Sequence, residues 1–213
     1  KELLLGISII LVSIIFYPNK QVISNSTGSG GGGGNTNSPI DGQNCTACHN
    51  GAINSVNYTD TFSYNIMPVV FDPISNQWDG VYTPGVTYTF TYLITDNSSI
   101  SNKYGFELTA EADVANQKTG AFFITNSAET QLTNLGTAVT HTAGGTSTTN
   151  NIKEWSVDWQ APSAGTGDVT MYVSSLAANS NGNNNGDNIF ASSYSFQEAV
   201  ALPVLTFGNI TPT

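Results

Sequence analysis

The strongest constraint on the fold is an alternation of apolar and polar side chains in several short runs. In the longest run, Val86, Tyr88, Phe90, Tyr92 and Ile94 alternate mainly with threonines. Successive side chains of a β-strand point to opposite faces, so this pattern predicts a strand with one buried and one solvated face. Four further runs have the same period, at residues 104–108, 155–159, 169–173 and 190–196.

Turn-forming clusters separate these runs, and no long helical pattern lies between them. The clusters are rich in Asn, Gly, Ser, Thr, Pro and Asp and cover residues 96–102, 144–151, 162–168 and 179–187. Short strands at this spacing predict an all-β domain, a β-sandwich of seven or eight strands. Aromatic residues make up 10% of the chain, enough to build a packed core and to argue against a disordered polymer.

The charge pattern excludes two classes of partner. Only 9% of the residues are charged, the net charge is −10, and the five basic residues are all Lys. Binding to nucleic acid or to an anionic membrane surface needs clustered cations, so we expect neither for the folded part. The polar but uncharged composition suits an extracellular β protein.

The N-terminal part reads as an export segment followed by a linker. Residues 3–16 form an apolar run that is short for a membrane span and fits the hydrophobic core of a signal peptide, although no clear cleavage site follows. A retained N-terminal helix, as a membrane anchor or packed inside a filament, is the alternative for residues 1–23. Residues 24–38 are rich in Gly and Ser and predict a flexible linker. They lack the Gly-Lys-Ser/Thr and the flanking strand and helix of a nucleotide-binding loop.

The chain carries one chemical motif, Cys45-Thr46-Ala47-Cys48-His49. This is the spacing of c-type haem attachment, in which two thiols reach the vinyl groups of the porphyrin and the histidine binds the iron. Haem is attached after export, which agrees with the signal-like segment. Because these are the only two cysteines, no disulfide framework holds the domain. A local Cys45–Cys48 disulfide, a free thiol pair and another metal remain as alternatives.

The sixth iron ligand has several candidates. His141 is the only other histidine, and Met67 precedes Pro68 in an irregular stretch. Met171 lies in an alternating run and reads as core, and water is the remaining choice. We favour His141 as the ligand, although a lone histidine is often a hydrogen-bonded structural residue. Residues 179–187 faintly resemble a calcium loop, but Phe190 stands where the bidentate Glu is needed, so they read as a tight loop.

The order of several short pieces is similar to the Reeler-like, choice-of-anchor V domains of bacterial surface proteins. The matching pieces are Pro39 with Cys45 to Gly51, Tyr82 to Gly85 with Thr87-Tyr88, Tyr104 to Leu108, His141-Thr142, Trp155, Trp159 to Pro162, Gly167, Val169, Tyr172 and residues 179–187. The resemblance implies an immunoglobulin-like, Greek-key sandwich over residues 39–200 and no enzymatic activity. Reeler domains without the cysteine motif also have His-Thr or His-Ser at the position of His141, which implies a role in the fold.

The C-terminal residues 201–213 resemble the start of a type IX secretion sorting segment. Leu202-Pro203-Val204 is followed by Phe207, and the segment is truncated. The resemblance implies a surface protein of a Bacteroidetes-like bacterium, with the periplasm as the alternative location.

Two functions from different classes follow. The first is a cell-surface or periplasmic mono-haem c-type cytochrome that exchanges electrons with a redox protein. The second is a haem-free surface module for adhesion or assembly, with a filament subunit as a minor variant. Since no nucleophile elbow or readable His–carboxylate pair is present, we do not expect an enzyme.

Overall fold

The computed structural model describes residues 27–28, 32–54, 58–66, 80–97, 101–147 and 150–200. The signal-like segment 1–23, Met67 and residues 201–213 lie outside these ranges. Within them, the helices are single 3₁₀ turns, and none is long and apolar enough to cross a membrane.

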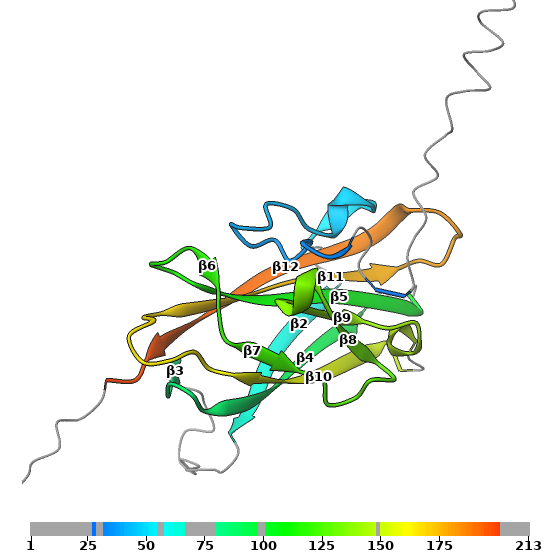
Figure 1. The fold of residues 1–213 in the computed structure, drawn as a ribbon. Coiled ribbons are helices and arrows are strands. Elements are labelled where there is room, and N and C mark those ends of the chain that lie inside the picture. Colours follow the sequence, from blue (N-terminus) through cyan, green and yellow to red (C-terminus); the bar gives the residue numbers. More distant parts are fainter. Residues whose placement is uncertain are drawn as a thin grey trace, which may run out of the picture.

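The described residues form two sheets (Figure 1). The larger has eight strands, in the order β1-β12-β11-β5-β9-β8 with β3 and β6 paired to β12 and β5, and the smaller has the order β2-β4-β10-β7. The bounds are β1 Asn50–Ile53, β2 Tyr58–Ile66, β3 Val81–Tyr82, β4 Thr87–Asp96, β5 Lys103–Ala112, β6 Gln117–Lys118, β7 Ala121–Phe123, β8 Thr130–Thr133, β9 Ala138–His141, β10 Ile152–Gln160, β11 Val169–Ala178 and β12 Asn185–Glu198.

This architecture confirms the predicted all-β, sandwich-like fold. The count of seven or eight strands was too low, because β1, β3, β6, β7, β8 and β9 have only two to four residues and show no readable period. The predicted turn region 179–187 also extended into β12, which begins at Asn185. The immunoglobulin-like Greek-key connection stays a prediction.

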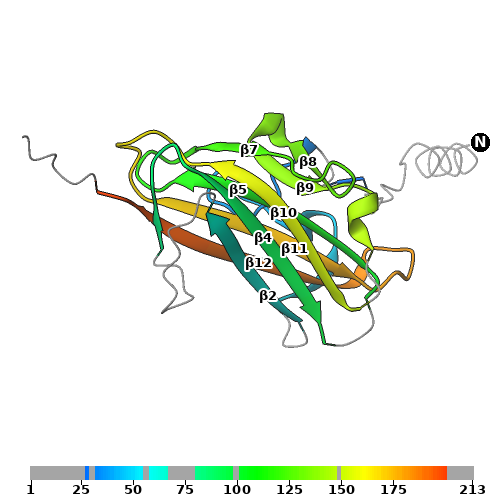
Figure 2. The same cartoon turned by 90° about the horizontal axis from the view of Figure 1, so that it is seen from below.

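The core lies between the two sheets, whose arrangement Figure 2 shows, and is rich in aromatic side chains. The alternation in β4 is confirmed, because Tyr88, Phe90, Tyr92 and Ile94 are buried. The antiparallel partner β10 contributes Trp155, whose ring stacks on Phe106 of the larger sheet with centroids 4.5 Å apart. Such offset aromatic contacts add to the free energy gained from burying apolar area.

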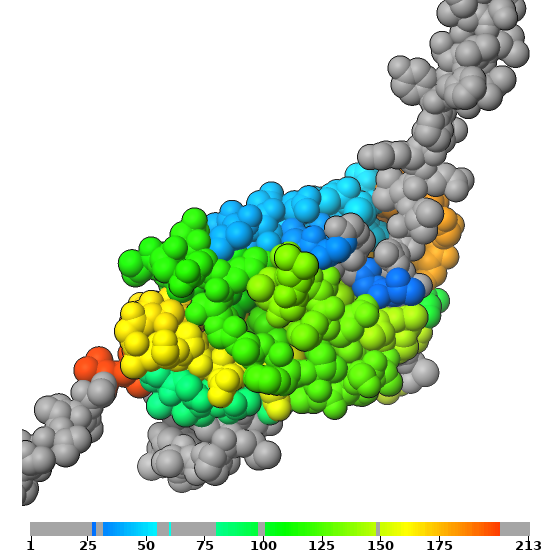
Figure 3. Space-filling view, viewed as in Figure 1, coloured from blue at the N-terminus to red at the C-terminus, as the bar shows by residue number. Residues whose placement is uncertain are grey.

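The central strand β5 departs from the expected one-sided burial. Its whole length after Lys103 is buried, including Glu107, Thr109 and Glu111 on the face turned away from the core. Residues 32–47, which we call the cover segment, pack over this outer face (Figures 1 and 3). Thr36 is fully buried there, and Gly34 N–H donates a 2.6 Å hydrogen bond to Glu107 Oε1.

The expected linker therefore needs correction over residues 32–38. Glycine and asparagine do not serve as a flexible spacer there; they let the backbone approach the sheet closely. A Cβ at Gly33 would lie 2.8 Å from Asn134 Cβ and 2.9 Å from Asn134 N. Gly33 also has a φ of 99°, which favours glycine.

Replacing Trp159 tests how much the packing of the aromatic core stabilises the fold. It is fully buried, and its ring lies 5.8 Å from the Phe90 ring and 6.0 Å from the Tyr82 ring. We expect Trp159→Ala to lower the free energy of unfolding by about 3–5 kcal/mol, measured by circular dichroism in a denaturant titration. The control Val114→Ala, at a site 87% exposed, should change it by less than about 0.5 kcal/mol. Equal effects of the two variants would contradict this description of the core.

Candidate functional site

The Cys45–His49 motif forms a tight turn at the end of the cover segment. The 3₁₀ turn η2 spans Cys45–Ala47, and Asn44 caps it by accepting the Thr46 N–H at 2.8 Å. The Cys45 carbonyl then accepts the His49 N–H at 2.9 Å. The turn leads directly into β1, which pairs in parallel with β12.

Cys45 is fastened to the larger sheet through Ser174 of β11. The Cys45 N–H donates to Ser174 Oγ at 3.2 Å, and the Ser174 hydroxyl donates to Cys45 Sγ at 3.2 Å. Burial raises the pKa of the Cys45 thiol to about 12, and the nearby Glu107 carboxylate adds to this increase. The thiol is therefore neutral and a poor nucleophile at physiological pH.

His49 is fastened to β12 through Asp187. Its Nδ1 lies 2.7 Å from Asp187 Oδ2, and the two side chains are only 11% and 2% exposed. Asp187 Oδ1 also accepts the Asn179 N–H at 3.0 Å, which holds the carboxylate in place. With Nδ1 donating to the carboxylate, Nε2 is the nitrogen left for another partner.

The loop 179–185 completes the site as a chain of asparagine turns. The side-chain oxygens of Asn179, Asn181 and Asn183 each accept a backbone N–H two residues further on. The Asn184 side chain donates to the Cys48 carbonyl at 2.8 Å. Because these amide oxygens are used within the loop, its geometry agrees with a tight turn rather than a calcium loop.

Gly51 is required where β1 meets β12. A Cβ at this position would lie 1.6 Å from the Asp187 carbonyl oxygen, so no other residue fits without moving the strand. This close approach places His49 beside the carboxylate of Asp187.

The structure anchors His141 elsewhere. Its Nδ1 accepts the Phe106 N–H at 3.1 Å, and its ring packs over Gly105, where a Cβ would lie 2.6 Å from Cε1. These contacts are with β5, whereas His49 contacts β12, and β11 lies between the two strands. The structure therefore does not bring the two predicted iron ligands together. Within the described ranges, no cluster of three His, Cys, Asp or Glu side chains is placed to hold a metal.

The fit of a covalent haem can be judged from Cys45. Attachment requires both sulfurs at the porphyrin edge and the histidine against the iron. Here Ser174 contacts both the backbone and the sulfur of Cys45, so a thioether at Cys45 would form on a sulfur that already accepts a hydrogen bond from the sheet. His49 keeps Nε2 available, because its Nδ1 is the nitrogen that contacts Asp187.

Sequence reasoning missed three residues of the site. Asp187 and Ser174 lie 138 and 129 positions from their partners, and no local pattern relates them. Glu107 offered a weak signal, because a charged residue inside a strongly apolar run indicates a specific partner when both faces of the strand are covered.

The fold and site define an all-β module with a polar cover over one sheet. The family model of the Reeler domain matches residues 75–181, just over half of the chain. The chain belongs to the Reeler domain family, which confirms that part of the resemblance. The matched range includes Glu107, His141 and Ser174 but begins after the Cys45–His49 motif, so membership does not bear on the motif.

Solved structures with a similar fold include two reeler domains. The Reelin-N domain of F-spondin is 24% identical, and the match covers 70% of this chain and 93% of that chain with a TM-score of 0.45. The human F-spondin reeler domain is 23% identical, with 70% and 94% covered and a TM-score of 0.46. The search of curated proteins returned no match.

The two thiols should differ in reactivity. In reduced protein at pH 8, we expect iodoacetamide to label Cys48 well before Cys45, because a pKa of about 12 leaves only about 10⁻⁴ of the Cys45 thiol ionised. Raising the pH to 9 should speed Cys45 labelling about tenfold, since its thiolate fraction rises in proportion. Peptide mass spectrometry measures both rates.

Glu107→Gln supplies a variant for the same measurement. Weakening the acceptor for Gly34 and Asn35 should loosen the cover segment, and removing the carboxylate charge should lower the pKa of Cys45, so both effects raise the Cys45 labelling rate. The control is Glu154→Gln on the exposed face of β10, which should leave the rate unchanged. Equal labelling of Cys45 and Cys48 in the unaltered protein would contradict the burial of Cys45.

Proposed function

We propose that the chain is a haem-free, extracytoplasmic surface module for adhesion or assembly, in which the Cys45–His49 motif fastens the cover segment to the sandwich. The observation that carries this proposal is the double contact of Cys45 with Ser174. One of the two sulfurs that a haem would need, Cys45 Sγ, already accepts a hydrogen bond from Ser174.

Three independent anchors support the structural role of the motif. Ser174 holds Cys45, Asn184 holds the Cys48 carbonyl, and Asp187 holds His49. A neutral hydrogen bond contributes roughly 0.5–1.5 kcal/mol and one to a charged group roughly 1.5–3 kcal/mol, so together they can hold a short turn in place.

The composition supports an extracytoplasmic location and a protein partner. The chain is acidic overall, few of its side chains are charged, and the N-terminal apolar run resembles an export signal. A folded sandwich with many Thr, Ser and Asn side chains offers hydroxyl and amide groups for polar contacts, which suits recognition of another surface protein.

One observation favours the second candidate, a mono-haem c-type cytochrome. The Asp187 carboxylate holds His49 through Nδ1 and leaves Nε2 available, as is usual for histidines that bind metals. This candidate requires Cys45 to leave Ser174 and the cover segment to separate from β11.

Expression in a host that attaches c-type haem decides between the two. We expect a colourless product whose mass equals that of the unmodified polypeptide, apart from signal cleavage. A red product whose haem resists acid-acetone extraction would overturn the proposal and establish the cytochrome. In that case His49→Ala should give a misligated or lost haem, because the iron would lose its proximal bond.

The fold should not depend on the thiols. The aromatic core that includes Trp155 and Phe106 lies on the opposite face of the larger sheet from Cys45. We expect the Cys45→Ser, Cys48→Ser double variant to keep a cooperative thermal transition and a β-type circular dichroism spectrum. A non-cooperative, molten product would show that the core needs the intact motif.

A further inference from the structure

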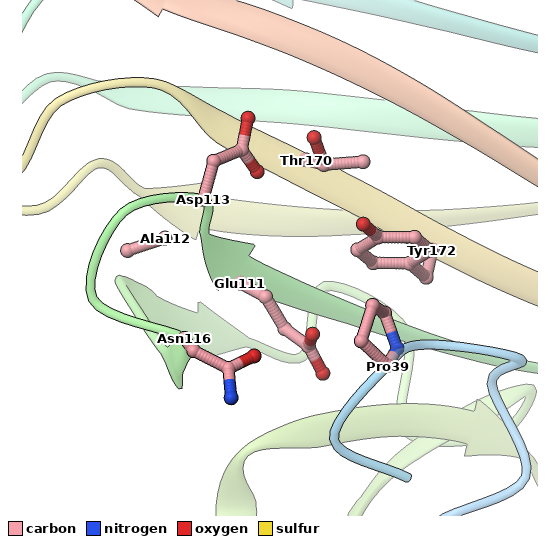
Figure 4. Close-up of a pocket in the computed structure, with 7 residues that line it drawn as sticks. All are labelled: Pro39, Glu111, Ala112, Asp113, Asn116, Thr170 and Tyr172. Carbon is pink, nitrogen blue, oxygen red and sulfur yellow. The ribbon is translucent and has the colours of Figure 1, made fainter. Parts of the chain in front are cut away.

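A polar cavity of about 210 Å³ lies on the outer face of the larger sheet, away from the cysteine motif (Figure 4). It is bounded by the end of β5, the turn toward β6, the start of β11 and the cover segment. Its lining residues are Pro39, Glu111, Ala112, Asp113, Asn116, Thr170 and Tyr172.

Glu111 is the unusual residue of this cavity. It is only 3% exposed, and its buried Oε1 has no hydrogen-bond partner. A carboxylate that is removed from water without a partner is unfavourable by several kcal/mol. Glu107, two residues earlier on the same face, shows the usual solution, because the backbone of Gly34 and Asn35 donates to it.

The nearest cation on the neighbouring strand does not serve Glu111. Lys118 of β6 is its register partner, yet its Nζ lies 2.6 Å from Asp41 Oδ1 of the cover segment. Lys118 Nζ therefore forms its ion pair with Asp41, although it has no hydrogen bond of regular geometry, and no ion pair joins it to Glu111 among the described residues.

The other polar atoms that face the cavity are mainly oxygens. Figure 4 shows the Asn116 amide oxygen turned toward the Glu111 carboxylate, with the Tyr172 side chain across the cavity. The Thr170 hydroxyl is hydrogen-bonded to Ser195 Oγ at 2.9 Å. Burial raises the pKa of Tyr172, and the negative charges of Asp113 and Glu111 raise it further.

We propose that this cavity binds a calcium ion, with Glu111 as the main ligand. Carboxylate and amide oxygens are the donors that this hard cation prefers, and the ion would supply the missing partner of Oε1. A volume of about 210 Å³ also leaves room for several waters of about 30 Å³ each. Few protein ligands and many waters predict a dissociation constant of roughly 10⁻⁴–10⁻³ M, the range of extracellular modules.

The test uses the full chain after treatment with a chelator and its removal. Calorimetric titration with calcium chloride should give saturable binding in that range, and 10 mM calcium should raise the Tm by about 3–11 °C. Glu111→Gln should lose the binding heat and the Tm shift. The matched control Glu154→Gln, an exposed glutamate on the smaller sheet, should keep both.

A second variant keeps the proposal testable if Glu111→Gln does not fold. Asn116 has a φ of 46°, a conformation that aspartate also tolerates, so Asn116→Asp should keep the fold and add a carboxylate. We expect a lower Tm without calcium and at least threefold tighter binding with it. No saturable binding to the unaltered chain, or equal shifts in Glu111→Gln and Glu154→Gln, would overturn the proposal. The site is independent of the function proposed for the cysteine motif.

Discussion

Glu107 lies in the middle of β5 with its carboxylate on the face turned away from the aromatic core, and it accepts hydrogen bonds from Gly34 and Asn35. A buried carboxylate is tolerated only when such donors replace water. The cover segment supplies them through its backbone, which is possible because Gly34 has no side chain and a φ of 90°. The position of the cover segment then brings Cys45 over Ser174 and His49 beside Asp187.

The two faces of the larger sheet are stabilised by different interactions, apolar burial on the inner face and hydrogen bonds on the outer face. The inner face packs rings such as Phe106 and Trp155 and gains free energy from apolar burial, which needs no particular direction. The outer face is held by hydrogen bonds from Glu107, Ser174 and Asp187, which require defined positions. The inner face accounts for most of the stability of the fold, whereas the outer face determines the placement of the motif.

The same outer face holds two acidic residues in contrasting environments. Glu107 is fully supplied with donors, while Glu111 faces a cavity and lacks one. Similarly, the raised pKa of the Cys45 thiol keeps it neutral and bonded to Ser174, whereas His49 retains one nitrogen without a role in the anchor. On this face, Glu111 Oε1 and His49 Nε2 are therefore the atoms that remain available to bind a ligand.

The class of fold and the location of the core strands could be predicted from the amino-acid sequence alone. The alternation at residues 86–94 and 155–159 reports a two-residue period, which is a local property of strands and can be read without a partner. The Cys45–His49 spacing likewise identified the motif as a unit. What that unit contacts depends on the three-dimensional fold, because Asp187 and Ser174 lie more than 120 residues away along the chain. The fold also determines that Glu107 and Glu111 are buried, since burial of the outer face depends on a cover segment whose glycines and asparagines carry no strand or helix period.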